Sequence, residues 1–118
     1  MASINCFTVA GNLTRDVELG FTPKGTAVAN YTVACNDVYH DDDGMRHEIA
    51  TFLPITTYGK QAQNDVAYLE KGSTVAVMGR ISSWSDPKTR TSGIALEGQR
   101  VQYLGRARAK TQGAVLRA

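Results

Sequence analysis

Aromatic and cationic side chains are the residues of this chain whose chemistry suggests a ligand. Aromatic faces stack on unpaired bases, which contributes about 1–3 kcal/mol per base, and cations along the same track neutralise phosphates. The candidate stacking residues are Tyr39, Phe52, Tyr58 and Trp84. The candidate cations for the nucleic-acid backbone are Arg15, Arg46, Lys60, Arg80, Lys88 and Arg90. Together they indicate a surface able to bind a single-stranded nucleic acid.

Each aromatic candidate also has a structural interpretation, which the sequence alone leaves open. Phe52 and Tyr58 lie in a strand-like run, where an aromatic side chain often packs in the core or across strands. Tyr39 precedes an Asp-Gly hairpin signal and could cover the apolar face of that hairpin. Trp84 has a serine on either side and is the best candidate for an exposed aromatic face.

Three adjacent carboxylates, Asp41 to Asp43, raise the question of a metal site. A calcium-binding loop needs further oxygen ligands at fixed offsets and a closing Glu, which are missing in this register. The cluster is therefore expected to be a solvated hairpin tip, because Asp is mostly exposed in proteins. The sequence predicts no metal and no other cofactor.

The two cysteines, Cys6 and Cys35, do not indicate catalysis or disulfides. Neither His40 nor His47 forms a recognisable nucleophile motif with a cysteine. Disulfide-dependent secreted domains carry more cysteines at tighter spacing. Both thiols lie in strand-like runs, so we expect them to be buried as small apolar groups. The chain is not expected to be an enzyme.

Length and composition predict one soluble domain. The chain has 118 residues, 42% hydrophobic and 20% charged, which is ordinary for a globular protein. No apolar run approaches the roughly 20 residues that a membrane helix needs. The first residues do not follow the pattern of a secretory signal peptide. These observations predict a cytoplasmic protein with no membrane partner.

Charge is distributed unevenly along the chain. Residues 1–98 hold eight of the 13 basic residues and all 11 acidic residues, which gives this part a net charge of −3. Residues 99–118 hold the other five basic residues and no acid. Because phosphate neutralisation normally shows as a basic face, a nucleic-acid site here must be a local basic groove, rely on stacking, or use the basic tail.

The order of periodic segments predicts an all-β fold. Alternating runs of β-forming residues indicate five strands, and a stretch with apolar residues at helical spacing indicates one helix at 60–70. The expected strands are residues 4–11, 27–38, 46–58, 74–83 and 91–103. Pro54 interrupts the third run, which suggests an edge position or a bulge. This pattern fits a five-stranded OB-fold barrel with one α-helix between strands 3 and 4. We expect this domain to span residues 1–105 and to be followed by a short, basic and flexible tail at 106–118.

Several ordered motifs resemble the bacterial single-stranded DNA-binding protein family. The matching segments are residues 1–5, 11–16, 22–30, 58–60, 68–75, 79–81 and 102–105. The resemblance covers roughly residues 1–105. It implies an OB-fold that assembles as a homotetramer, or a dimer, and protects single-stranded DNA in replication, recombination or repair. It also implies a place near the nucleoid.

The chain departs from that family at several positions. Phe52 stands where the family usually has a stacking Trp, and Pro54 replaces a basic residue that follows it. Tyr39 matches another aromatic stacking position, whereas the short loop near Trp84 gives no secure match. The family's acidic, apolar C-terminal tip is absent, so recruitment of partner enzymes through such a tip is not expected.

A second hypothesis comes from a different functional class. The net charge of −3, Pro54 and the acidic hairpin suggest an OB-fold adaptor that has lost most DNA affinity, similar to primosomal replication protein N.

Overall fold

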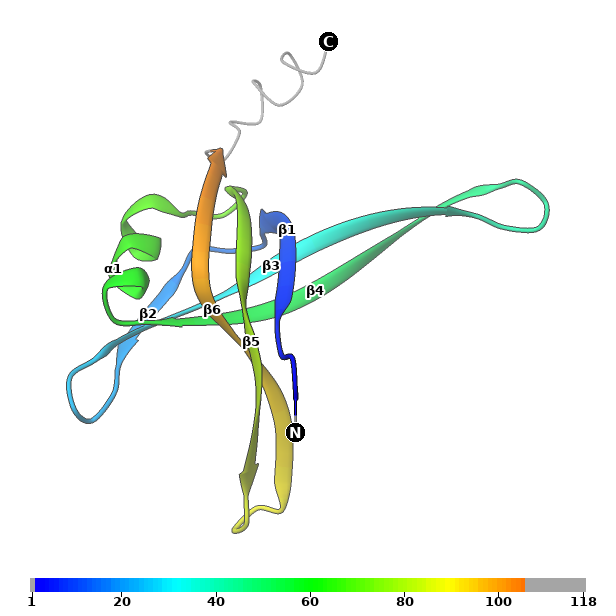
Figure 1. Cartoon of the computed structure of the whole chain (residues 1–118). Helices are drawn as coiled ribbons and strands as arrows, with labels where there is room; N and C mark the ends of the chain where they lie inside the picture. Colours follow the sequence, from blue (N-terminus) through cyan, green and yellow to red (C-terminus); the bar gives the residue numbers. More distant parts are fainter. Residues whose placement is uncertain (1, 106–118) are drawn as a thin grey trace.

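A computed structural model describes residues 2–105 of the chain, and the predicted tail at 106–118 lies outside the described residues. It contains a single helix and six strands within that range (Figure 1). The elements in chain order are β1 (Phe7–Leu13), β2 (Glu18–Phe21), β3 (Ala27–His40), β4 (Arg46–Tyr58), α1 (Gly59–Tyr68), β5 (Thr74–Asp86) and β6 (Thr91–Gly105).

Five of the strands close into a barrel. The sheet order is β1-β5-β6-β4-β3-β2, and an additional pairing between β1 and β3 completes the ring. The pairing of β4 with β6 is parallel and short, whereas the other strand pairs are antiparallel. The predicted OB-fold barrel is therefore confirmed, with the helix between the third and fourth of the five predicted strands.

The first part of the chain differs from the predicted strand at residues 4–11. β1 begins later, at Phe7, because the side chain of Asn5 takes the place of a backbone pair. Its Nδ2 donates to the carbonyl of Ile81 at 2.6 Å, and its Oδ1 accepts from the N–H of Ile81 at 2.8 Å. Sequence reasoning also missed β2, a four-residue strand that pairs only with β3. So short a run is below the length at which alternation becomes visible.

The core lies inside the barrel and follows the two-residue period of the strands. Inward side chains from all five barrel strands and the residue after α1 form one buried cluster: Leu13, Tyr31, Val33, Ile55, Leu69, Val75, Val77 and Val101. A second small cluster joins Ala62 of α1 to Ala27 and Ala29 of β3. Because alternate residues of a strand point to opposite faces, the residues between these core positions point outward.

α1 ends earlier than its sequence pattern indicates. It stops at Tyr68, where the N–H of Leu69 bonds to the carbonyl of Asp65 at 2.9 Å and the backbone becomes extended. Gly72 was expected to terminate the helix, but it lies in the following turn with a φ of 89°. Leu69 is 5% exposed, so the apolar spacing reflects burial of Leu69 outside the helix.

Two hairpins extend from the barrel as separate arms (Figure 1). One is the distal part of β3 and β4, and the other is the distal part of β5 and β6. Pro54 pairs with Thr32 of β3 without a register shift, and the pairing of β4 with β6 involves only Ile55 and Thr56. Pro54 therefore lies at a free strand edge, as one of its two predicted positions requires.

The prediction that both cysteines are buried is wrong. Cys6 is exposed because it precedes β1 and lies outside the paired strands. Cys35 is half-buried, and its Sγ lies 3.2 Å from the carbonyl oxygen of Ala10. Within residues 2–105, no helix has the length and apolar character needed to cross a membrane.

Candidate nucleic-acid interface

The outer surface of β4 carries two of the predicted aromatic residues. Ile55 and Thr57 are buried, so the alternation of β4 turns Phe52 and Tyr58 outward. Phe52 is 60% exposed and Tyr58 is 48% exposed. They are six residues apart on one strand, which corresponds to about 20 Å. Their faces are therefore open to solvent on the same side of the strand and are not used by the core.

A row of outward polar residues crosses the sheet next to Tyr58. The register joins Glu18 of β2 to Asn30 of β3, and Asn30 to Thr56 of β4. The hydroxyl of Thr56 donates to Oδ1 of Asn30 at 2.8 Å. The row continues from Thr56 to Glu97 of β6, and from Glu97 to Arg80 of β5. Arg80 therefore lies two strands away from Thr56, with an acidic residue between them.

Trp84 lies on the same side of β5 as Arg80, four residues further along. It is 50% exposed and opposes Gly93 of β6. A Cβ atom at Gly93 would lie 3.0 Å from the Trp84 ring, so the indole rests directly on the glycine backbone. One face of the indole is thus supported by the hairpin, and half of its surface stays accessible. This geometry suits stacking on a base.

Tyr39 lies on the arm of β3 and β4. Its ring stacks on that of His47, with centroids 5.0 Å apart and planes 18° from parallel. By strand alternation, Tyr39 belongs to the face of β3 that carries Tyr31 and Val33, which is opposite to the face of Phe52. It is 46% exposed. The structural interpretation of Tyr39 as a cross-strand partner therefore has a definite contact.

The acidic hairpin tip is organised by one of its carboxylates. Oδ1 of Asp41 accepts from the backbone N–H groups of Asp43 and Met45 at 2.9 and 2.8 Å. Its Oδ2 lies 2.7 Å from Nε2 of His47, and this hydrogen bond, followed by those from the backbone, lowers the pKa of Asp41. Across residues 2–105, His, Cys, Asp and Glu side chains nowhere gather in a group of three or more that could hold a metal ion.

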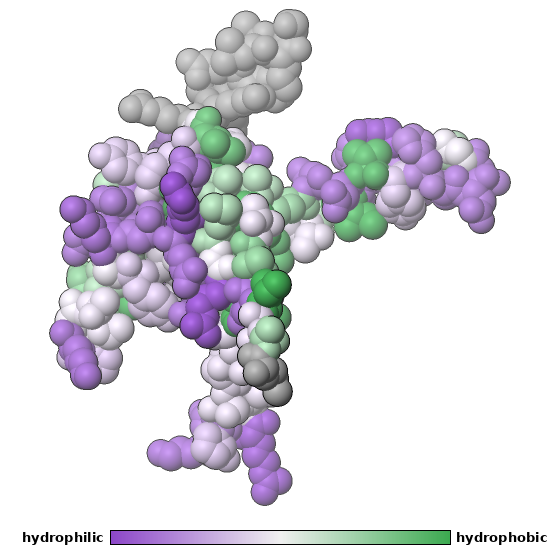
Figure 2. Space-filling model, viewed as in Figure 1, coloured by the Kyte–Doolittle hydropathy of each residue, from purple (hydrophilic) through white to green (hydrophobic). Residues whose placement is uncertain are grey.

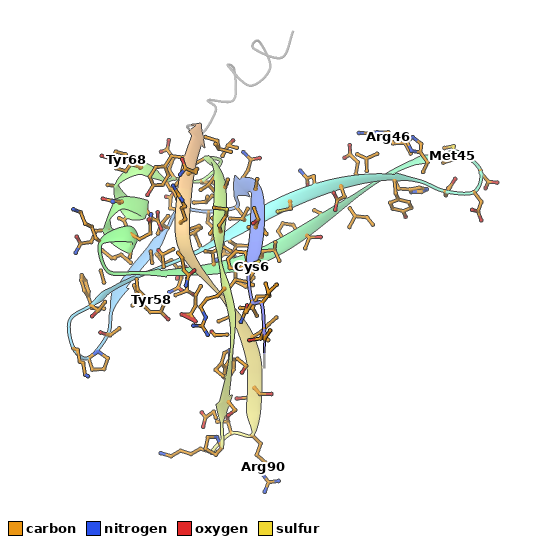
Figure 3. All side chains as sticks on the ribbon, viewed as in Figure 1. Cys6, Met45, Arg46, Tyr58, Tyr68 and Arg90 are labelled. Carbon is orange, nitrogen blue, oxygen red and sulfur yellow. The ribbon has the colours of Figure 1, made fainter. Side chains whose placement is uncertain are left out.

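The predicted cations do not form one continuous groove. Figure 3 shows Arg46 near the end of one arm and Arg90 at the end of the other. Arg46 pairs with Glu48 at 2.8 Å. Lys88 lies with Arg90 in the turn of the β5–β6 arm, whose end is hydrophilic in Figure 2.

The other two cations lie close to the barrel. Lys60 is in the first turn of α1, two residues after Tyr58, and Arg15 lies in the segment between β1 and β2. Gly59 adopts a φ of 66°, which lets the chain turn directly from β4 into α1. That turn places Lys60 beside the outward surface of β4. Arg15 lines a pocket together with Pro54.

Sequence reasoning missed a buried carboxylate under the helix. Asp65 is fully buried, and hydroxyls and an amide hold its two oxygens. Oδ2 accepts from Thr57 at 2.6 Å and from Tyr31 at 3.3 Å. Oδ1 accepts from Tyr103 at 2.7 Å and from Gln61 at 2.9 Å. This network joins α1 to β3, β4 and β6, and so positions the helix that follows Tyr58.

The network changes the ionisation of its two tyrosines. Burial, followed by the Asp65 carboxylate, raises the pKa of Tyr31 well above its ordinary value. Burial and the hydrogen bond to Asp65 also raise the pKa of Tyr103. An isolated Asp on an otherwise apolar helix face was the available sequence signal, because such a residue needs buried partners. Asn30 and Thr56 had a weaker signal, since they share the strand face of Tyr58.

Comparisons with known proteins agree with this geometry. A family model described as "Single-strand binding protein family" matches residues 4–104. A single-stranded DNA-binding protein of Halalkalibacterium halodurans is 37% identical over 113 residues, which cover 93% of this chain and 66% of the relative. "Single-stranded DNA-binding protein 3" of Clostridium acetobutylicum is 40% identical over 105 residues, which cover 86% of this chain and 71% of the relative.

Other relatives are longer, and the chain spans about half of them, for example 49% of the protein from Helicobacter hepaticus. Among solved structures, the complex of a Plasmodium falciparum protein of this kind with single-stranded DNA has a TM-score of 0.79 and 17% identity. The match covers 88% of this chain and 97% of that one. At this identity the likeness supports the fold.

Proposed function

Because this chain belongs to the single-strand binding protein family, we propose that it binds and protects single-stranded DNA and catalyses no reaction. The observation that carries the proposal is the outward surface of β4, β6 and β5, where Phe52, Tyr58 and Arg80 lie on neighbouring strands. Exposed aromatic faces beside a cation provide stacking and phosphate contacts without sequence readout. Roles in replication, recombination or repair are part of the same proposal.

The proposed stacking residues are Trp84, Phe52, Tyr58 and Tyr39. The exposure of Phe52 and Tyr58 and the supported indole of Trp84 favour stacking. Tyr39 would add a base further out on its arm, through the ring surface that His47 leaves free. A strand that contacts all four residues would run over the barrel and along both arms.

The proposed contacts to the DNA backbone are made by Arg15, Arg46, Lys60, Arg80, Lys88 and Arg90. Their separation on the barrel and both arms favours a long path with isolated phosphate contacts over one basic groove. The acidic tip at Asp41 to Asp43 repels phosphate, so the path should avoid the end of the β3–β4 arm. Stacking would then supply a larger share of the affinity than electrostatics.

The test is a titration of the purified protein with a fluorescently labelled oligo-dT strand and its duplex, at two salt concentrations. Trp84 is the single tryptophan of the chain, so its emission reports on one site. Tight, salt-sensitive binding of the single strand with quenched Trp84 is the expected result. Binding without quenching would remove Trp84 from the site, and absence of binding at low salt would favour the adaptor hypothesis instead.

Variants make the site assignment specific. Phe52→Ala and Tyr58→Ala should each weaken oligo-dT binding roughly 5- to 150-fold, which corresponds to one lost stacked base. Tyr68→Ala is the matched control, because Tyr68 is 66% exposed at the other end of α1 from Tyr58 (Figure 3). An equal loss in Tyr68→Ala would contradict the assignment.

The proposal also includes the assembly of the chain. We propose a homotetramer or dimer of the domain at 1–105, followed by a basic tail at 106–118, in the cytoplasm near the nucleoid. Several large apolar side chains are exposed in the single chain, which supports contact with further copies: Ile4, Phe21, Met78, Ile94 and Leu104. Light scattering of the full chain tests the assembly, and a monomer at micromolar concentration would refute it.

A further inference from the structure

A pocket of about 240 Å³ opens on the outer side of the barrel, between the segment after β1 and the strands β3 and β4. The residues used in the argument below are Arg15, Asp16, Glu18, Asn30, Thr32 and Pro54, and all of them line it. Asn30 lies one strand row from Tyr58, because Val28 opposes Tyr58 and Asn30 opposes Thr56. The pocket is thus next to a proposed stacking residue.

Asn30 offers hydrogen-bond donors to this pocket. Its Oδ1 already accepts from the hydroxyl of Thr56 at 2.8 Å, and this bond fixes the orientation of the amide. The Nδ2 group carries two N–H donors. Asn30 is exposed, so these donors are available to a ligand in the pocket.

Glu18 offers acceptors beside those donors. It is directly opposite Asn30 in the antiparallel pairing of β2 and β3. Residues so paired have Cβ atoms about 4.5–5.5 Å apart, which is within reach of one base edge. A carboxylate accepts two hydrogen bonds side by side. The pocket therefore presents two adjacent acceptor oxygens next to an N–H donor.

The charge of the pocket selects against a phosphate. Two carboxylates, Asp16 and Glu18, surround the single cation Arg15. One oxygen of Asp16 accepts from the backbone N–H of Lys71 at 2.8 Å, which leaves the carboxylate in place as a negative charge. Such surroundings favour a ligand that brings N–H donors, as the edge of a base does.

We propose that this pocket reads guanine in a bound single strand. The Watson–Crick edge of guanine presents two adjacent donors, N1–H and N2–H, beside the acceptor O6. Glu18 would accept from both donors while Asn30 donates to O6. Adenine, cytosine and thymine each have one donor group on this edge, so none of them satisfies both oxygens of Glu18 in this way. Single-stranded bases are commonly recognised through this edge.

The inference rests on the proposed binding of single-stranded DNA and adds a base preference to it. Tyr58 would stack on one base, and the neighbouring base would enter the pocket, because two residues of a strand span about 6.7 Å. The ring of that guanine would lie against Pro54. Hydrogen bonds to the carboxylate are charge-assisted and account for most of the discrimination.

The experiment compares oligo-dT strands in which one central thymidine is replaced by guanosine, inosine or cytidine. Binding is measured by anisotropy competition with the full chain. One guanosine should raise the affinity roughly 5- to 150-fold over oligo-dT, the range expected for one bidentate base contact. Inosine lacks the N2 amino group and should fall between the two. Equal affinity for all strands, or a preference for cytidine, would overturn the inference.

Variants link the preference to the pocket. Glu18→Gln should reduce the guanosine preference to less than about threefold while oligo-dT binding persists, because its amide offers a donor where N1–H or N2–H must bind. Glu70→Gln is the matched control on another surface and should retain the preference. A preference that survives in Glu18→Gln would also refute the assignment. If the wild type binds no strand at all, the proposed function itself fails.

Discussion

Replacement of Asp65 by Ala tests whether the buried network holds the helix on the barrel. The substitution removes the acceptor of four hydrogen bonds at the junction of α1 with β3, β4 and β6. Two of the donors, Thr57 and Tyr31, are 0% and 5% exposed, so water cannot readily replace the carboxylate there. Tyr103 is 39% exposed, and its hydroxyl can turn to solvent.

The expected cost follows from the two buried donors. A buried donor left without a partner costs about 1–3 kcal/mol. Two such donors give a loss of about 2–6 kcal/mol in the free energy of unfolding. This is a large fraction of the about 5–15 kcal/mol that stabilises a typical domain. The substitution should therefore bring the protein close to the limit of folding at 25 °C.

Urea denaturation followed by far-ultraviolet circular dichroism measures this loss. Asp37→Ala is the matched control, because Asp37 is an exposed Asp on the β3–β4 arm, and it should change the stability by less than about 0.5 kcal/mol. Tyr103→Phe removes one donor and retains the carboxylate, so a smaller loss of about 1.5–3 kcal/mol is expected. A loss below about 1 kcal/mol in Asp65→Ala would refute the reasoning that its buried hydroxyl partners need this acceptor.

Three further predictions concern pH and packing. From about pH 10 the unfolded chain releases phenolic protons that the folded chain retains, because the pKa values of Tyr31 and Tyr103 are raised; stability should therefore fall with rising pH. The slope from Tyr31 is about 1.4 kcal/mol per pH unit, with less from the more exposed Tyr103, and urea titrations at alkaline pH showing a flat stability would contradict it. Gly79→Ala would place a Cβ atom against the carbonyl of Glu97, so a loss of about 1–3 kcal/mol is expected in the same assay, and an unchanged midpoint would be inconsistent with that contact. The lowered pKa of Asp41 predicts that hydrogen-exchange protection of the hairpin-tip amides is present at neutral pH and decreases below about pH 4, and protection independent of pH would count against it.

Much of the fold was predictable because its determinants are local. The alternation around Val33 and Ile55 indicates half-buried strands, and the apolar spacing of Ala62, Val66 and Leu69 indicates a helix. β2 was missed because four residues are too few for a periodic signal, and its pairing depends on an edge of β3 that exists only in the folded chain. The extent of α1 was overestimated because Leu69 is buried without being helical.

The candidate site was predictable in residue types and only partly in arrangement. The outward direction of Phe52 and Tyr58 follows from strand alternation once the core residues are known. The separation of Arg46 from Arg90 could not be predicted, since both lie near sequence turns that fold into different arms. The stacking of Tyr39 on His47 also depends on the exact register of the hairpin.

The sequence by itself determined the class of fold, the exposed aromatic and cationic residues, and the resemblance to a family, because these depend on composition and short-range pattern. Only the tertiary structure decided which of those residues are neighbours. Glu18, Asn30, Thr56 and Arg80 are far apart in the chain and become one row because strand register pairs them. Asp65 likewise acquires its partners through long-range packing. Register and packing minimise the free energy of the whole chain, so no local segment encodes them alone.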